Sequence, residues 1–207
     1  EGEIVVEPEP IAITIPDPIL ENLIRNTLQL FEGPILSTDL AMITVLDGDV
    51  DEITGIASLT GLEYCINIIE IRISNGTIID LTPLSNLSSL EQITLDNHQI
   101  LDINPLKNLF NLEWLSLIGN QVSVLSPLEG LQRLSTLYLD SNQLDDTNIQ
   151  ILSSLTDLEI LGLEHNLITN LSPLSNLSKL MALYLSSNNI TDIKSLGALT
   201  NLMILHL

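Results

Sequence analysis

A repeat of apolar residues every 22 positions is the feature that most constrains what this chain can fold into. Six full units begin at Ile68, Leu90, Leu112, Leu134, Leu158 and Leu180, and a seventh begins at Leu202. The unit that begins at Leu134 has 24 residues, so its two extra residues must bulge outward or lengthen the outer segment. One coil of this length cannot bury its own apolar side, so the repeat predicts stacked coils that share a continuous core.

The spacing inside a unit predicts the shape of each coil. In the unit that begins at Leu180, the pattern Leu183-x-Leu185 has period two, which predicts a short strand with one face inward. Apolar residues then recur at every third position, which predicts a 3₁₀ turn or a short extended stretch on the opposite side. Proline lies in this return segment, where no sheet donor is needed, at Pro83, Pro105, Pro127 and Pro173.

A polar position follows each strand at one fixed offset. Asparagine holds it in four units, at Asn120, Asn142, Asn166 and Asn188, whereas Gly76 and His98 hold it in the first two units. A buried amide at this point can bond backbone groups of adjacent coils. We therefore expect an asparagine ladder between the coils, with Asn142 buried within it and a structural role for His98.

Charge and composition limit the partners of this chain. The net charge is −21, from 27 acidic and 6 basic residues, which argues against nucleic acid and against an anionic membrane surface. No stretch approaches the ~18 unbroken apolar residues of a membrane span. The acidity has three open interpretations: a solvated surface, attraction of a basic partner, or a salt-rich habitat. The single cysteine, Cys65, excludes an intramolecular disulfide and is expected to be a small buried side chain.

The repeat units resemble those of a known family. The run Leu171-Ser-Pro-Leu-Ser-Asn-Leu-Ser-Lys-Leu-Met-Ala-Leu-Tyr-Leu-Ser-Ser-Asn-Asn-Ile-Thr-Asp-Ile193 is similar to the 22-residue repeats of internalins and related secreted bacterial leucine-rich-repeat proteins. The resemblance implies an α/β leucine-rich-repeat solenoid, curved, with a parallel β-sheet on the concave face and 3₁₀ or extended segments on the convex face. It also implies a secreted or surface-anchored binder of proteins. Intracellular phosphatase-regulator repeats have similar spacing, so a cytoplasmic location is the less favoured alternative.

The N-terminal segment has the signals of a helical cap. Asp17 is a suitable N-cap, Pro18 suits the first helical position, and a second short helix is expected at 37–42. A degenerate first coil is expected to follow, with its repeat positions at Leu40, Ile43, Val45, Gly48, Val50, Ile53, Ile56 and Leu59. This segment resembles the N-terminal cap of internalin-like proteins. The expected organisation is an acidic Pro-containing linker (1–14), the cap with its degenerate coil (15–61), and the repeats (62–207).

The outward strand positions carry the candidate partner-binding site. The single Trp and two of the three Tyr lie at these positions. Three acids, Asp96, Asp140 and Glu164, share one repeat offset beside them and should therefore line up across the strands. Aromatics with acids nearby are typical of protein-binding hot spots, although exposed aromatics also satisfy strand preference alone. The predicted site comprises Asp96, Trp114, Ile118, Tyr138, Asp140, Glu164, His165 and Tyr184. Tyr138 and Tyr184 are expected roughly 10 Å apart, two strand spacings, on either side of Gly162.

No motif in the chain indicates catalysis, a cofactor or a metal. No nucleophile is fixed near His98, His165 or His206, and single turn acids at one offset, Asp80, Asp102 and Asp192, are expected to be solvated and not to bind calcium. The favoured function is protein binding, for adhesion or recognition, through the concave face. Three alternatives stay open: glycan binding by the aromatics, a structural spacer within a larger secreted protein, and intracellular regulation of an enzyme.

The last unit is incomplete in this sequence. Leu207 is its third apolar residue, and an uncapped coil exposes inward leucines and a strand edge. We expect that the natural chain continues or that this end packs against another chain, which includes self-association.

Overall fold

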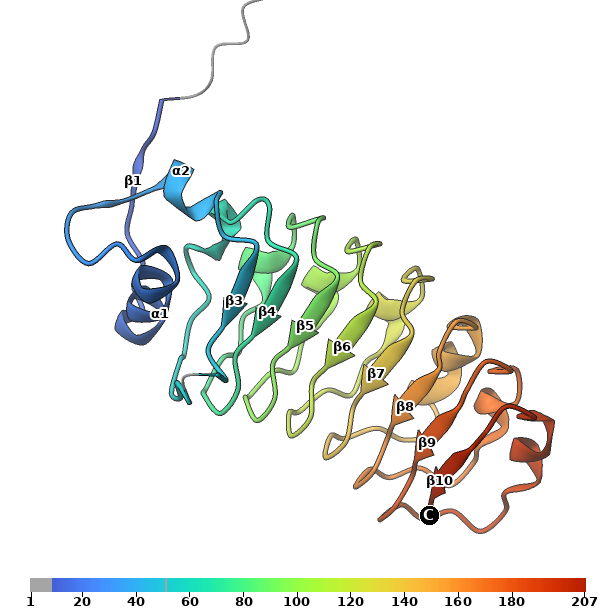
Figure 1. Cartoon of the computed structure of the whole chain (residues 1–207). Coiled ribbons are helices and arrows are strands. Elements are labelled where there is room, and N and C mark those ends of the chain that lie inside the picture. The colour runs from blue at the N-terminus through green and yellow to red at the C-terminus, as the bar shows by residue number, and fades with distance from the viewer. Residues whose placement is uncertain (1–8, 51) are drawn as a thin grey trace, which may run out of the picture.

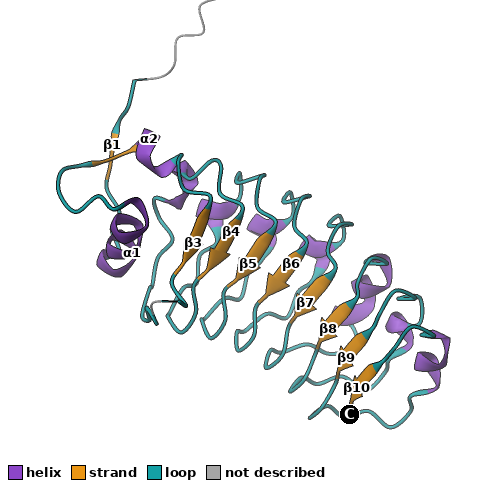
Figure 2. Cartoon of the chain, viewed as in Figure 1, coloured by secondary structure: helices purple, strands orange, loops and turns teal. Residues whose placement is uncertain are grey.

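The computed structural model describes residues 9–50 and 52–207, so residues 1–8 of the predicted linker lie outside the described residues. The chain forms an elongated stack of coils, with strands side by side on one face and 3₁₀ segments on the other (Figure 1, Figure 2). The eight strands of this face form one parallel sheet in sequence order from β3 to β10. The predicted leucine-rich-repeat solenoid is confirmed.

Each strand of the parallel sheet is three residues long, with its central side chain directed inward. The strands are β3 (Val45–Asp47), β4 (Glu70–Arg72), β5 (Gln92–Thr94), β6 (Trp114–Ser116), β7 (Thr136–Tyr138), β8 (Ile160–Gly162), β9 (Ala182–Tyr184) and β10 (Ile204–His206). The central residues of neighbouring strands lie in register, as Leu137 does with Leu161. Both of these side chains are fully buried, so replacing either with alanine would cost about 2–5 kcal/mol of stability.

The opposite side of the stack consists of 3₁₀ segments, as the period of three predicts. They are η1 (Leu62–Tyr64), η2 (Thr82–Leu84), η3 (Asn104–Leu106), η4 (Ser126–Leu128), η5 (Asn148–Ser154), η6 (Ser172–Leu174) and η7 (Lys194–Ala198). The four prolines of the return segments are the second residues of η2, η3, η4 and η6. The 24-residue unit contains the seven-residue η5, so its extra residues lengthen the convex segment.

The turn acids that precede three of these segments have a local structural task. Asp80, Asp102 and Asp192 each accept a hydrogen bond from the backbone N–H two residues later, at 2.8, 2.8 and 2.9 Å. A carboxylate in this position satisfies a donor at the start of a turn that has no partner within the segment. These acids therefore cap the 3₁₀ segments as well as facing solvent.

The asparagine ladder joins adjacent coils as the sequence predicts. The Asn142 Oδ1 accepts from the Val122 N–H at 2.9 Å, and its amide nitrogen donates to the Leu117 and Leu139 carbonyls at 2.9 and 3.1 Å. Asn142 is half-buried, less than predicted, whereas Asn120 and Asn166 are buried. The same three kinds of contact recur at all four ladder asparagines.

His98 replaces an asparagine in this ladder. It is buried; its Nε2 lies 2.9 Å from the Ile73 carbonyl, and its Nδ1 accepts from the Ile78 N–H at 3.3 Å. These bonds require a neutral ring with the proton on Nε2. Gly76 makes room for the ring, since a Cβ at Gly76 would lie 2.8 Å from the His98 Cε1. The predicted structural role of His98 is confirmed.

The N-terminal cap is tied to the first coil by one carboxylate. Asp17 is the N-cap of α1 (Pro18–Leu28), with its Oδ1 accepting from Ile19 and Leu20 at 2.9 and 3.1 Å. Its Oδ2 accepts from the backbone N–H groups of Ala57 and Ser58 at 2.7 and 3.1 Å. The second predicted helix is present as α2 (Ser37–Leu40). The predicted N-cap role of Asp17 is confirmed, and the same side chain also docks the cap onto the repeats.

Two details of the N-terminal segment differ from the sequence prediction. Within the stretch assigned to a linker, β1 (Ala12–Ile13) pairs antiparallel with β2 (Ile35–Leu36), which holds this part of the chain against the cap. In the first coil the buried strand residue is Leu46 and not Val45, which is 43% exposed, because the parallel register aligns Leu46 with Ile71. Val50 is likewise exposed and not inward.

Candidate functional site

The outward side chains of the sheet stand in columns because the parallel strands are in register. One column contains Tyr138, Gly162, Tyr184 and His206 on β7 to β10. Trp114 lies on β6 in the neighbouring column, and its ring centroid is 5.6 Å from that of Tyr138. The Tyr138 and Tyr184 centroids are 6.5 Å apart, and the Tyr184 and His206 centroids are 5.0 Å apart. These four rings form a continuous band, the aromatic row (Trp114, Tyr138, Tyr184, His206).

The two tyrosines are closer than two strand spacings, and Gly162 is the reason. A Cβ placed on Gly162 would lie 2.6 Å from the Tyr138 Cδ1 and would also overlap the Asp140 Oδ2. The Tyr138 ring and the Asp140 carboxylate therefore lean across β8 into the space that a side chain would fill. The predicted separation of about 10 Å, with a gap between the rings, is wrong because the Tyr138 ring occupies that gap.

A shallow hollow of about 330 Å³ lies beside the tyrosines, and we call it the tyrosine hollow. Its lining is Ile118, Tyr138, Asp140, Ser141, Glu164, His165 and Tyr184. Six of the eight residues in the predicted site line it, whereas Asp96 and Trp114 lie outside it. His206 was missed by the prediction, although it stands 22 residues after Tyr184 and therefore shares its outward offset.

Three acids, Asp96, Asp140 and Glu164, form another column just beyond the ends of the strands, and their side chains differ in their hydrogen bonds. The Asp96 Oδ1 accepts from the Ser116 hydroxyl at 2.7 Å and from the Ile118 N–H at 2.8 Å. The Asp140 Oδ1 accepts from the Glu164 N–H at 2.7 Å. Each aspartate thus satisfies a backbone donor in the next coil. The Asp96 Oδ1 thus serves the fold, and Asp96 lies outside the tyrosine hollow, so its role as a contact residue stays a prediction.

Burial and charge set the protonation behaviour of these acids. Burial raises the pKa of the Asp96 carboxyl and of the Asp140 carboxyl above the usual value, against the lowering effect of their hydrogen bonds. Repulsion from Glu164 adds to the rise of the Asp140 pKa. The Glu164 carboxylate makes no hydrogen bond or ion pair with any residue that the structure describes. It is therefore the acid of this column most available to a partner.

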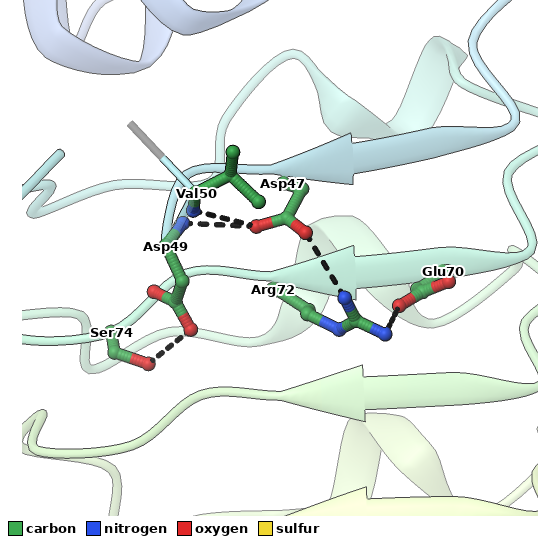
Figure 3. A network of polar contacts seen from close by, with 6 residues as sticks. All are labelled: Asp47, Asp49, Val50, Glu70, Arg72 and Ser74. Carbon is green, nitrogen blue, oxygen red and sulfur yellow. Dashed lines mark hydrogen bonds and ion pairs between the residues drawn. The ribbon is translucent and has the colours of Figure 1, made fainter. Parts of the chain in front are cut away.

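The other end of the concave face has a different character. Arg72 lies between two acids of β3 and β4, with its Nη1 3.1 Å from the Asp47 carboxylate and its Nη2 paired with Glu70 (Figure 3). Asp49 accepts from the Ser74 hydroxyl at 2.9 Å. The side chains at this end pair with one another, whereas the aromatic row presents half-buried Trp and Tyr rings and the tyrosine hollow presents the unpaired Glu164 carboxylate. The concave face thus has a self-paired polar end and an aromatic end.

The repeat, the parallel sheet and the ladder define the class of this protein as a leucine-rich-repeat solenoid. Residues 132–190 match the family described as "Leucine rich repeat", and residues 111–149 match "Leucine Rich repeats (2 copies)". No curated protein sequence matches the chain significantly.

Solved structures narrow the class to a family. The chain is 31% identical to internalin C2 from Listeria monocytogenes, with a TM-score of 0.70 and coverage of 92% of each chain. It is 27% identical to an internalin, inlF, of the same organism, with a TM-score of 0.53 and coverage of 93% of this chain and 75% of that one. The chain belongs to the internalin-like leucine-rich-repeat proteins, which confirms the resemblance seen in the sequence.

A plant receptor shares the fold over a smaller part of both chains. The leucine-rich-repeat ectodomain of the membrane receptor kinase GASSHO1/SCHENGEN3 from Arabidopsis thaliana, solved in complex with Casparian strip integrity factor 2, is 30% identical. The match has a TM-score of 0.64 and covers 73% of this chain and 19% of that one. Within the described part of this chain, no helix has the length and apolar character needed to cross a membrane.

Proposed function

We propose that this chain is the protein-binding module of a secreted or cell-surface bacterial protein, and that its partner docks on the aromatic end of the concave face. Leucine-rich-repeat domains generally bind other proteins on extended concave surfaces and are not typically enzymes. The observation that carries the proposal is the aromatic row, which places the only Trp and two Tyr side by side on a face that the core does not need.

The composition of this surface fits protein recognition. Trp and Tyr are enriched among the few residues that carry most of the free energy of binding. Rings at centroid distances of 5 to 6.5 Å support one another, so little conformational entropy is lost when a partner covers them. The location outside the cell rests on kinship with internalins. Self-association through the last coil stays a prediction.

The proposal is tested with a variant that removes two rings of the row. The double variant Tyr138→Ala, Tyr184→Ala should weaken partner binding by several kcal/mol, because hot-spot truncations cost about 2 kcal/mol or more each. Immobilised wild-type and variant chains are exposed to extracellular and cell-surface proteins, captured proteins are quantified, and affinities for each purified candidate are measured by calorimetry.

Phe110→Ala is the matched control, since it removes an exposed ring outside the aromatic row. Circular dichroism confirms that both variants fold. Loss of binding in the control together with full binding in the double variant would show that the partner uses another face. Capture of polysaccharide and not protein by the aromatic row would replace the proposal with glycan binding.

A further inference from the structure

We infer that the tyrosine hollow receives the guanidinium group of an arginine side chain that the partner presents. The inference rests on the proposed function, because it names the chemistry that this surface selects within a protein partner. It is carried by the combination of an unpaired carboxylate, two tyrosine rings and an apolar wall in one hollow.

The charge of the hollow calls for a cation. Glu164 and Asp140 both line it, and no Lys or Arg does. The Asp140 Oδ1 is occupied by the Glu164 N–H, but its Oδ2 lies over Gly162 at the edge of the same space. The Glu164 carboxylate makes no contact with hydrogen-bonding groups among the described residues. Two carboxylates from adjacent coils thus offer free oxygens to one bound group, and a cation would relieve their mutual repulsion.

The walls of the hollow select a planar cation with a long stem. Guanidinium is weakly hydrated, stacks on aromatic faces and presents several N–H donors in a fixed plane, so it can contact a tyrosine ring and a carboxylate together. The Tyr138 and Tyr184 rings both line the hollow and are tilted by 35° relative to each other. Ile118 supplies an apolar side against which the methylene stem of arginine packs.

The fold keeps this hollow open without the partner. Asp140 is held by a hydrogen bond to the backbone of the next coil, and Tyr138 rests on Gly162. The neighbouring sheet positions are fixed by the parallel register of β7, β8 and β9. A preformed site loses less entropy on binding than one that must be ordered first.

A short peptide tests the inference without knowledge of the partner. The probe is acetyl-Gly-Arg-Gly-amide, with the same peptide carrying citrulline as a neutral isostere and lysine as a second cation. Binding is followed by backbone amide shifts in heteronuclear NMR. The arginine peptide should shift Ser141, Glu164 and His165, and should bind at least fivefold more tightly than either comparison peptide.

Two carboxylate variants separate the hollow from general acidity. Glu164→Gln should lower the affinity for the arginine peptide at least fivefold, whereas Glu129→Gln, at the end of η4 on the convex side, should leave it unchanged. The NMR spectrum of each variant reports whether it is folded. Equal affinity for arginine and citrulline, or shifts confined to other regions, would overturn the inference.

The partner itself distinguishes this inference from the proposed function. If the Tyr138→Ala, Tyr184→Ala variant loses the partner and Glu164→Gln retains full affinity, the concave site stands and the arginine pocket is wrong. If neither variant loses affinity, the concave site is wrong as well. If both variants lose affinity for the partner, by at least fivefold for Glu164→Gln, the concave site and the arginine pocket are both supported.

Discussion

His98 shows how one residue can change the chemistry of a structural position. Burial lowers the pKa of its imidazole below the usual value of 6.5, although the hydrogen bond to the Ile73 carbonyl and the charges of Asp96 and Asp49 act in the opposite direction. The folded chain therefore holds a neutral ring whose unprotonated Nδ1 accepts a hydrogen bond from the Ile78 N–H. A ladder asparagine makes the same kind of contact without a titratable group.

The first prediction at this scale concerns acid stability. Because the folded pKa of His98 is lowered, the unfolded chain binds the proton more readily, so stability falls as the pH drops below about 6.5. The loss continues down to the folded pKa, at up to about 1.4 kcal/mol per pH unit. His98→Asn should remove this part of the dependence. Urea unfolding of both chains at pH 7.5 and pH 5 measures it, and identical pH dependence in the two chains would contradict the prediction.

Single residues also show where sequence reasoning succeeds and where it stops. The Asp17 cap and the ladder could be predicted because each depends on a local or strictly periodic pattern. The roles of Asp96 and Glu164 could not, since both are acids in one column and only the coordinates show which accepts a backbone N–H. The repeat spacing predicts the position of a residue on the sheet. Its hydrogen bonds determine whether its side chain is available to a partner.

At the scale of the element, the first coil shows why the sequence did not predict the register of strand β3. Strand β3 contains consecutive apolar residues, Val45 and Leu46, so periodicity alone does not state which one is inward. The parallel pairing with β4 resolves this choice because Leu46 must align with Ile71. Gly48 then continues the sheet, donating to the Arg72 carbonyl at 2.8 Å. Later strands have an alternating pattern of Leu or Ile at the two inward positions, and their register was predicted correctly.

A prediction at this scale concerns Gly162 on strand β8 and its effect on the aromatic row. Gly162→Ala places a methyl group where the Tyr138 ring and the Asp140 carboxylate now lie, so both must move away from β9. The aromatic row should break between its two tyrosines, with a changed tyrosine signal in near-ultraviolet circular dichroism. Loss of the Asp140 bond to Glu164 would cost about 0.5–1.5 kcal/mol of stability.

Gly197→Ala is the control for this substitution. It lies in η7, where an added Cβ meets no atom within 4 Å, so the same chemical change should leave the tyrosine signal unaltered. An unchanged near-ultraviolet spectrum in Gly162→Ala would show that the rings do not depend on the absence of a side chain on β8.

At the scale of the whole molecule, a net charge of −21 on 207 residues acts on both the fold and the approach of a partner. Self-repulsion among the acids disfavours the compact state, whereas the same field accelerates association with a basic partner. Both effects weaken as salt shortens the Debye length from about 10 Å at 0.1 M to about 3 Å at 1 M. At the polar end of the concave face Arg72 pairs with Asp47 and Glu70, whereas at the aromatic end acids such as Glu164 have no cationic partner among the described residues.

The last prediction follows from this balance. Raising NaCl from 0.1 to 1 M at pH 7 should raise the midpoint of thermal unfolding, because screening reduces repulsion within the folded chain. The same change should slow association with a partner that presents arginine, by an order of magnitude or more where steering is strong. Near pH 4.1, where the net charge is close to zero, salt should have little effect on the midpoint. If the midpoint at pH 7 does not depend on salt, the acids do not repel one another enough to affect stability. If the association rate does not fall with salt, they do not steer the partner.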